Sequence, residues 1–415
     1  MKYILIGAGS RGMVYGSCAQ ELGVEITAVA ELRSDRRKHA AAAFNIPAAM
    51  CFRDGKDLLA LGKIADAAII ATMDRDHYTH VMQALDCGYD ILLEKPVSPD
   101  PAECLAIEEK ANALGRSITV CHVLRYAPFF MELKKIVDSG ELGRIVAIKH
   151  SENIGNFHMA HSFVRGNWRN DTLSSPIILQ KSCHDLDILL WLTGSHCKKV
   201  AAFGSLQYFR PENAPANAAG RCLDCPASEN CRFDAWQTYQ PMLGQWPADV
   251  VCLEQTEQSL KDALRTGPYG RCVYKCDNNV CDHMSVAMEF DGGITATFSL
   301  TAQTSNIHRN IHIMCQDGEI EADDLNGTIT VTHFRRNQAD APISRTITLG
   351  GRLDGHGGGD EAIMADFTAS LKTAPGSSRS SISNSVESHL MAFAIEKSRL
   401  TGQVVDLTAY KNSLA

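Results

Sequence analysis

The chain begins with a glycine-rich turn that limits how its first segment can fold. An apolar run at residues 3–6 leads directly into the G-x-G-x-x-G pattern of residues 7–12. In this pattern Gly7 makes the tight turn, Gly9 lets the backbone approach a pyrophosphate, and Gly12 lets the next helix pack on the sheet. The following helix directs its free N–H groups at the phosphates. The pattern predicts a dinucleotide site whose cofactor-binding residues include Gly7, Gly9, Ser10, Arg11 and Gly12.

A carboxylate follows the second predicted strand. The apolar run at residues 25–30 ends in Glu31, where an acidic side chain accepts hydrogen bonds from the adenosine ribose hydroxyls and repels a 2′-phosphate. Glu31 therefore favours NAD as the cofactor. Arg33, Arg36 and Arg37 lie close to it and could pair with a 2′-phosphate, so the residues leave NADP open.

The composition indicates a globular protein of two domains. The chain has 415 residues, 45% of them hydrophobic and 21% charged, which is enough to bury large cores. A net charge of −8 argues against a nucleic-acid partner. A core strand that starts at residue 3 leaves no room for a signal peptide, and no run of about 18 apolar residues suggests a membrane span. We therefore expect a cytoplasmic protein with no membrane or nucleic-acid partner.

Strands and helices alternate through residues 1–122. Buried strands are predicted at residues 65–71, 89–93 and 118–122, with helices between them. This alternation predicts an α/β fold with a doubly wound parallel sheet, the Rossmann fold, whose ligands lie beyond the carboxyl ends of the strands. The residues expected at that edge are Thr72, Asp74, His77, Glu94 and Lys95.

The pattern changes in the rest of the chain. Segments such as residues 145–151, 284–290 and 294–301 alternate as antiparallel strands do. We expect residues 123–415 to form an α+β substrate domain with a large, mostly antiparallel open sheet. A loop is predicted from Pro375, before a final helix.

Charged residues and a histidine occur where catalytic groups would be expected. Glu94-Lys95-Pro96 follows a strand, where a lysine can hydrogen-bond both the nicotinamide ribose and a substrate hydroxyl. His184 opens an apolar helix and is followed by Asp185, a placement that suits a proton shuttle. The alternatives are a solvated ion pair and a structural histidine beside a capping aspartate.

The loop at residues 161–169 is dense in hydrogen-bond donors and aromatic rings. Arginine and asparagine make directional bonds and tryptophan stacks on a ring face, a mixture that suits a polyhydroxylated ligand. The alternative is a surface loop anchored by its tryptophan. Its candidate substrate-binding residues are Arg165, Asn167, Trp168 and Arg169.

Together these motifs resemble those of the Gfo/Idh/MocA oxidoreductases. The resemblance rests on residues 7–12, on Ala-Thr-x-Asp-x-x-His at residues 71–77, on Glu-Lys-Pro at residues 94–96 and on residues 181–187, and it covers nearly the whole chain. It implies a Rossmann domain and an α+β domain whose open sheet mediates assembly into a homodimer or homotetramer. It also implies a nicotinamide cofactor that takes hydride from a carbinol of a sugar or cyclitol.

The resemblance also implies roles for single residues. Lys95 would bind substrate and position the nicotinamide, His184 would be the general base, and Glu94 would orient Lys95. His122 and Arg125 match the segment that crosses from the cofactor domain to the substrate domain.

One position departs from the family pattern. Members with the inositol-type pattern carry an aspartate four residues before the catalytic histidine, and this chain has Gln180 there. Lys181 stands beside it, as in other branches. We therefore expect Lys95, Lys181 and His184 to share the proton transfer and the substrate contacts.

Residues 210–282 are rich in proline, cysteine and polar residues with little periodicity, and we interpret them as an insertion. Four thiolates could hold a structural zinc ion that braces a segment without a core of its own. Free thiols, disulfides and an iron–sulfur cluster are the alternatives. The expected zinc ligands are Cys222, Cys225, Cys231 and, as first choice for the distant one, Cys272, with Cys276 as the next choice.

His356 precedes three glycines and Asp360, and it either faces the site or lies in a mobile loop.

The leading function is an NAD-dependent oxidoreductase that oxidises a secondary alcohol of a sugar, sugar acid or cyclitol. A second is a glycoside hydrolase that uses bound NAD for transient oxidation, elimination and water addition. A third, a non-catalytic nucleotide-binding regulator, is disfavoured by the presence of both Lys95 and His184.

Overall fold

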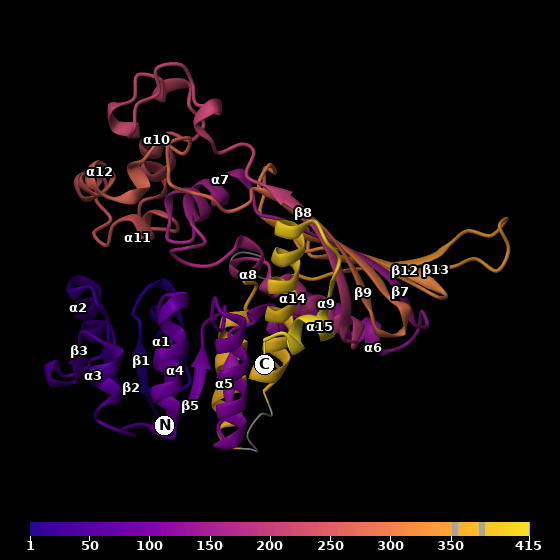
Figure 1. Cartoon of the computed structure of the whole chain (residues 1–415), viewed down its shortest axis with the longest axis horizontal. Coiled ribbons are helices and arrows are strands. Elements are labelled where there is room, and N and C mark those ends of the chain that lie inside the picture. The colour runs from indigo at the N-terminus through magenta and orange to yellow at the C-terminus, as the bar shows by residue number, and fades with distance from the viewer. Residues whose placement is uncertain (351–355, 373–377, 415) are drawn as a thin grey trace.

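The computed structural model describes residues 1–350, 356–372 and 378–414, and it contains two β-sheets (Figure 1). The first sheet has six parallel strands in the order β3-β2-β1-β4-β5-β6. Its chain order reverses between β1 and β4, which is where doubly wound sheets bind ligands. The strands are β1 (Lys2–Ile6), β2 (Glu25–Ala30), β3 (Cys51–Phe52), β4 (Ala67–Ile70), β5 (Asp90–Leu93) and β6 (Ile118–Val120).

Helices connect these strands, as the sequence alternation predicts. The central strands are buried on both faces, so their sequences read as continuous apolar runs. The two-residue strand β3 has no such run, and the sequence did not predict it. The helices are α1 (Ser10–Glu21), α2 (Ser34–Ala43), α3 (Gly55–Leu59), α4 (His77–Asp86) and α5 (Pro101–Ala113).

A helix from the end of the chain completes the packing around the first sheet. Helix α13 (Gly359–Ser370) packs against α1 and the turn at Val123–Tyr126. Phe367 of this helix is fully buried, with its ring centroid 5.7 Å from that of Tyr3 on β1. The predicted loop from Pro375 falls partly outside the described residues.

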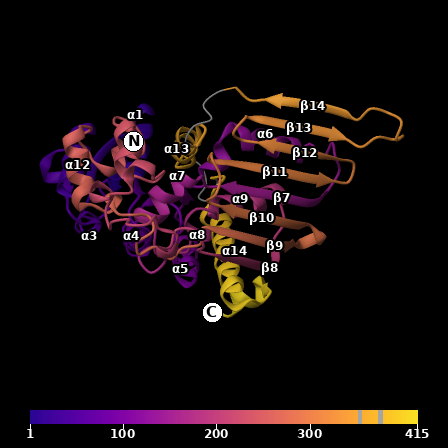
Figure 2. The ribbon, with the colours of Figure 1, turned by 90° about the horizontal axis from the view of Figure 1, so that it is seen from above.

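The second sheet has nine strands in the order β14-β13-β12-β11-β7-β10-β9-β8-β15, which Figure 2 shows side by side except for the short β15. Among the described strands of this sheet, only β7 and β10 pair in parallel, so the predicted mostly antiparallel sheet is confirmed. The strands are β7 (Ile145–Asn153), β8 (Cys197–Ser205), β9 (His283–Phe290), β10 (Thr295–Thr301), β11 (His308–Cys315), β12 (Gly318–Asp323), β13 (Thr328–His333), β14 (Ile343–Thr348) and β15 (Val405–Asp406).

The long helix α14 joins the two sheets into one molecule. It packs against β8 and α9 of the second layer and against α5 and β6 of the first. The helices around this sheet are α6 (Pro128–Asp138), α7 (Asn156–His158), α8 (Ile177–Gln180), α9 (Cys183–Thr193), α14 (Ile382–Thr401) and α15 (Leu407–Asn412). Within the described ranges, we find no helix with the length and apolar character needed to cross a bilayer.

Residues 206–282, here called the 206–282 segment, leave the second sheet after β8 and return to it at the neighbouring β9. The segment holds a small apolar cluster that includes Tyr239, Ala248, Leu260 and Leu264. In Figure 1 it forms the lobe above the nucleotide-fold sheet. Its helices are α10 (Ala235–Tyr239), α11 (Ala248–Val251) and α12 (Glu257–Thr266).

Gly12→Ala should destabilise the protein. A Cβ on Gly12 would lie 2.0 Å from the Gly7 carbonyl oxygen, whereas one on Gly9 would meet only Arg36 Nη1, at 3.7 Å. We expect Gly12→Ala to lower the free energy of unfolding by about 1–3 kcal/mol, the usual cost of overpacking. Urea denaturation measures the change, with Gly9→Ala as the matched control. Equal unfolding midpoints for the two variants would contradict this packing account.

Candidate active site

The turn after β1 has the features of a phosphate site. Gly7 has a φ of +89°, a left-handed conformation that favours glycine, and a Cβ there would lie 2.5 Å from the Ala71 carbonyl oxygen. Helix α1 begins at Ser10, and no side chain caps its first N–H groups. These N–H groups and the open approach at Gly9 fit the pyrophosphate of a dinucleotide.

Glu31 lies beside this turn, as predicted. Its carboxylate accepts hydrogen bonds from the backbone N–H groups of Ala8 and Arg33, both at 2.9 Å. The Arg33 guanidinium is paired with Asp35, and Arg37 donates to the Glu31 carbonyl oxygen at 2.6 Å.

The Arg11 guanidinium binds two carboxylates of the protein. Its guanidinium donates to Glu94 at 2.9 Å and to Asp360 at 2.5 Å, and it also contacts the Tyr15 hydroxyl. These pairs link α1 to the end of β5 and to α13. The sequence predicted that Arg11 binds the cofactor. In the structure its guanidinium is already bound to Glu94 and to Asp360, a carboxylate remote in the sequence.

Glu94 and Lys95 follow β5 but bind different partners. The Glu94 carboxylate accepts the backbone N–H of Lys95 at 2.7 Å, while Lys95 Nζ donates to the Gln180 carbonyl oxygen at 2.7 Å. Glu94 thus positions Lys95 through its backbone and not through its ammonium group. The Lys95 ammonium lies between the end of the first sheet and α8.

The other residues at this sheet edge brace the site. His77 is fully buried, and its ring nitrogens contact the carbonyl oxygens of Pro96 at 2.8 Å and Thr72 at 3.2 Å. The Asp74 carboxylate accepts hydrogen bonds from two serine hydroxyls of the substrate side, Ser174 at 2.6 Å and Ser175 at 3.2 Å. Both His77 and Asp74 therefore have partners within the protein.

Two buried imidazole rings lie beside Lys95. His184 on α9 and His122 have ring centroids 5.5 Å apart, and none of their four nitrogens has a hydrogen-bond partner among the described residues. Burial and the Lys95 ammonium lower the pKa of His184 well below its usual value. Burial likewise lowers the pKa of His122. A neutral imidazole can accept a proton, so His184 has the state that a general base needs.

Lys181 lies at the end of a buried charge network. Its Nζ is 3.2 Å from the Glu152 carboxylate, which also pairs with Arg309. Asp185 accepts hydrogen bonds at 2.8 Å from both Arg309 and His150. Burial lowers the pKa of Lys181, although Glu152 opposes the shift. Glu152 holds the Lys181 ammonium in place, while burial favours proton release from it.

Sequence reasoning missed Glu152 and His158. Glu152 falls on the buried face of β7 with Ile148 and His150, so a charged residue at a core position was the available signal. Burial lowers the pKa of His158 well below its usual value, and the positive charges of Lys181 and Lys95 act in the same direction. Its Nδ1 is buried without a partner among the described residues.

His356 also reaches the site. Its ring centroid lies 6.0 Å from that of His184, and its Nδ1 is 3.2 Å from the Asp360 carboxylate. The sequence left His356 equally balanced between the site and a mobile loop. In the structure it lies between His184 and the Arg11–Asp360 pair.

Two predicted ligands have internal roles. Arg125 forms a buried bidentate pair with Asp187, with contacts of 2.6 and 2.8 Å. Arg165 is buried and donates to the carbonyl oxygens of Arg271 at 2.7 Å and Phe233 at 2.6 Å. Their guanidinium groups therefore bind other parts of the protein instead of a ligand.

The remaining loop residues lie nearer the surface. Asn167 is exposed and contacts Met73 Sδ at 3.9 Å, next to the first sheet's ligand edge. Trp168 is half-buried against Phe163, and Arg169 pairs with Asp277 at 2.7 Å. Of this loop, Asn167 has the freest side chain.

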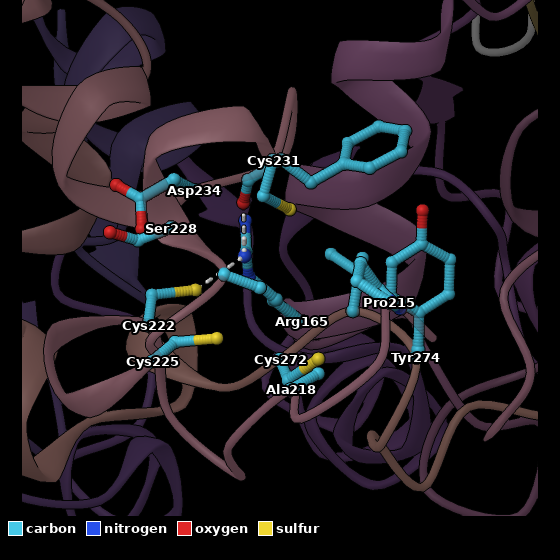
Figure 3. Close-up of a pocket in the computed structure, with 13 residues that line it drawn as sticks. Arg165, Pro215, Ala218, Cys222, Cys225, Ser228, Cys231, Asp234, Cys272 and Tyr274 are labelled. Carbon is cyan, nitrogen blue, oxygen red and sulfur yellow. Dashed lines mark hydrogen bonds between the residues drawn. The ribbon is translucent and has the colours of Figure 1, made fainter. Parts of the chain in front are cut away.

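The structure does not support the expected zinc site. The four predicted ligands do line one cavity, but Arg165 lies among them and donates to Cys222 Sγ at 3.3 Å (Figure 3). A guanidinium there brings positive charge to the place where a zinc ion would sit. Across residues 1–350, 356–372 and 378–414, no group of three or more histidine, cysteine or acidic side chains is arranged to hold a metal ion. All the cysteines of the described residues are free thiols.

Two family models match the chain. Residues 1–122 match the oxidoreductase family with an NAD-binding Rossmann fold, and residues 130–321 match the GFO/IDH/MocA C-terminal domain. The chain belongs to the Gfo/Idh/MocA oxidoreductases. The resemblance inferred from the motifs is confirmed, and with it the NAD-binding fold.

Relatives of known name support a sugar or polyol dehydrogenase-type enzyme. Inositol 2-dehydrogenase of Corynebacterium glutamicum is 30% identical over 204 residues, which are 47% of this chain and 55% of that protein, so the chain spans about half its length. The oxidoreductase YteT of Bacillus subtilis is 25% identical over 313 residues, 73% of this chain and 72% of that protein.

Solved structures share the fold. An oxidoreductase from Agrobacterium radiobacter, in complex with NAD+, L-tartaric acid and magnesium, has a TM-score of 0.70 at 15% identity, with 99% of each chain covered. An oxidoreductase domain protein from Kribbella flavida has a TM-score of 0.72 at 15% identity, with 98% of each chain covered. At this identity the likeness shows the architecture alone.

Asp185→Asn should weaken the protein and change its response to acid. Burial alone would raise the pKa of Asp185, but Arg309 and His150 outweigh it and lower the pKa to about 2. Because the pKa is lower in the folded state, this stabilisation is present above about pH 4 and is lost as the pH falls toward about 2. We expect Asp185→Asn to cost about 3 kcal/mol at pH 7 and less at pH 3, measured by urea denaturation.

The matched control is Asp86→Asn, which removes an exposed pair with Lys110. An exposed pair contributes about 1 kcal/mol or less, so this variant should unfold almost like the parent protein. Equal losses for the two variants, or a loss at Asp185 that does not depend on pH, would show that the buried network is not stabilised by charge.

Proposed function

We propose that this protein oxidises a secondary alcohol of a sugar, sugar acid or cyclitol with NAD. The observation that carries the proposal is the neutral, buried His184 ring, whose nitrogens have no partner among the described residues and whose neighbour is the Lys95 ammonium. A base without an internal partner and a cation beside it are what alcohol oxidation requires. The family membership and the inositol dehydrogenase relative support the same class.

The residues divide the reaction between them. Lys95 binds the oxygen of the reacting carbinol and stabilises negative charge on it, while its hydrogen bond to Gln180 keeps the ammonium in place. A ring nitrogen of His184 accepts the hydroxyl proton. When bound at the glycine turn, NAD supplies the acceptor for the hydride that leaves the same carbon. The loss of one proton and one hydride leaves a ketone.

Lys181 and Asn167 are proposed as further substrate contacts. The Lys181 ammonium is fixed by Glu152, so it can donate to a second hydroxyl of a polyol. Asn167 has an exposed amide beside Met73, at the rim of the site. Trp168 and Arg169 are proposed to support this rim, because their side chains pack on Phe163 and pair with Asp277.

We propose NAD over NADP as the cofactor. The Glu31 carboxylate lies at the glycine turn, where it would face a 2′-phosphate, and Arg33 is neutralised by Asp35. Thr72 and His122 are proposed to line the nicotinamide end of the cofactor, since both follow strands at the carboxyl edge of the first sheet, β4 and β6.

We further propose a cofactor domain of residues 1–122, a substrate domain of residues 123–415, and a homo-oligomer formed through the second sheet. Phe203 on β8 supports the oligomer, because its apolar ring is 75% exposed while Val200 and Ala202 of the same strand are buried. An apolar ring this exposed gains free energy when a protein interface covers it.

Screening cyclitols, hexoses and sugar acids for NAD reduction tests the proposal. We expect at least one to reduce NAD faster than NADP. Lys95→Ala should abolish turnover, and His184→Ala should slow it by about 10²- to 10⁴-fold, because it removes the proton acceptor. Binding of NAD, followed by calorimetry, should be largely kept in both variants, which separates lost chemistry from lost cofactor.

Full activity in both variants would remove these residues from the mechanism. Release of an aglycone from a glycoside without accumulation of NADH would replace net oxidation by redox-assisted glycoside cleavage. Faster reduction of NADP would overturn the role given to Glu31.

A further inference from the structure

Trp246, in the 206–282 segment, is held firmly and yet remains open to solvent. Its ring centroid lies 5.9 Å from that of Phe157 and 5.5 Å from those of His158 and His161, all in steep edge contacts. The residue is nevertheless 41% exposed. A tryptophan that served only to anchor the segment would gain most by burying its whole ring, since burial of apolar surface is what stabilises an anchor.

His158 connects this indole to the proposed catalytic site. One side of the imidazole contacts Trp246, and the ring lies within electrostatic reach of the Lys181 and Lys95 ammonium groups. Its Nδ1 is buried with no partner among the described residues. His158 therefore lies near both the exposed indole and the two ammonium groups.

Further aromatic contacts fix the surroundings of the Trp246 ring. The His161 ring stacks on that of Tyr269, with centroids 4.8 Å apart and an interplanar angle of 15°, and its Nδ1 is 2.9 Å from the Tyr239 hydroxyl. Tyr239 and Tyr269 both belong to the 206–282 segment, so the segment is locked to residues 156–165 around Trp246. A rigid aromatic surface loses little conformational entropy when a ligand binds to it.

We propose that Trp246 forms a second sugar subsite and that the substrate has two rings, as in a glycoside or a disaccharide. The reacting ring lies at Lys95 and His184, and the second ring stacks on the exposed face of the indole. The apolar faces of sugar and aryl rings pack well on a tryptophan, whereas a free cyclitol bound at Lys95 has no second ring to place on the indole. This inference rests on the proposed function, because it takes the reacting ring to lie at Lys95.

Matched pairs of compounds test the inference. Each pair is a sugar and its own phenyl glycoside or disaccharide, or a cyclitol and its glycosylated form, assayed for NAD reduction. In the parent protein, the two-ring member should have a KM about tenfold lower than the one-ring member, as expected for one stacking contact. Trp246→Ala should remove this difference with little change in kcat, and Trp246→Phe should keep most of it.

Leu253→Ala is the matched control, because Leu253 is equally exposed at 41% and belongs to the same segment. It should leave both KM values unchanged. A Trp246→Ala variant that raises KM equally for both members of a pair, or a parent protein that does not prefer any two-ring compound, would overturn the inference.

A binding measurement separates this inference from the proposed function. If no compound reduces NAD, the proposed oxidation fails. Calorimetry of the NAD-bound protein with nitrophenyl glycosides and their parent sugars still measures binding at the Trp246 subsite. Tighter binding of the glycoside that is lost in Trp246→Ala supports the subsite. Equal affinity for glycoside and parent sugar contradicts it.

Discussion

The hydrogen bond from the Lys95 ammonium to the Gln180 carbonyl oxygen is the interaction on which the candidate site depends, because it fixes this cation between the two layers of the molecule. Lys95 follows a strand of the first sheet, and Gln180 ends a helix of the second layer. Glu94 secures the same point from the other side by binding the Lys95 backbone and Arg11. A shift of either layer would move the ammonium relative to the glycine turn.

The position of the Lys95 ammonium also affects the protonation state of the histidines around it. A buried imidazole beside an ammonium group is more stable without its proton, and both effects lower the pKa of His184. The carboxylates of the region do not reverse the effect, because each is already paired: Glu94 with Arg11, Asp185 with Arg309, and Glu152 with Arg309 and Lys181. Charge pairing around the site therefore leaves His184 neutral next to a cation.

The sequence predicted those parts of the structure that depend on local patterns. The glycine turn, the strand that ends before Glu94 and the helix that begins near His184 each have a periodic or motif signal. Contacts between distant segments had no such signal in the sequence. Asp360 forms an ion pair with the Arg11 guanidinium, and Arg165 hydrogen-bonds the 206–282 segment instead of a ligand. The spacing of the cysteines indicated shared surroundings correctly, but it could not show that Arg165 lies among them.

The protonation state of His184 tests the account most directly. Histidine hydrogen–deuterium exchange, read by mass spectrometry on peptides across pH 4–9, reports the pKa of single rings. His196 is the internal reference, because Glu387 raises its pKa. The account predicts that His184 titrates well below the ordinary value of about 6.5 and below His196, so that its ring is neutral at pH 7. A His184 that titrates at or above about 6.5 would contradict its role as a ready proton acceptor beside Lys95.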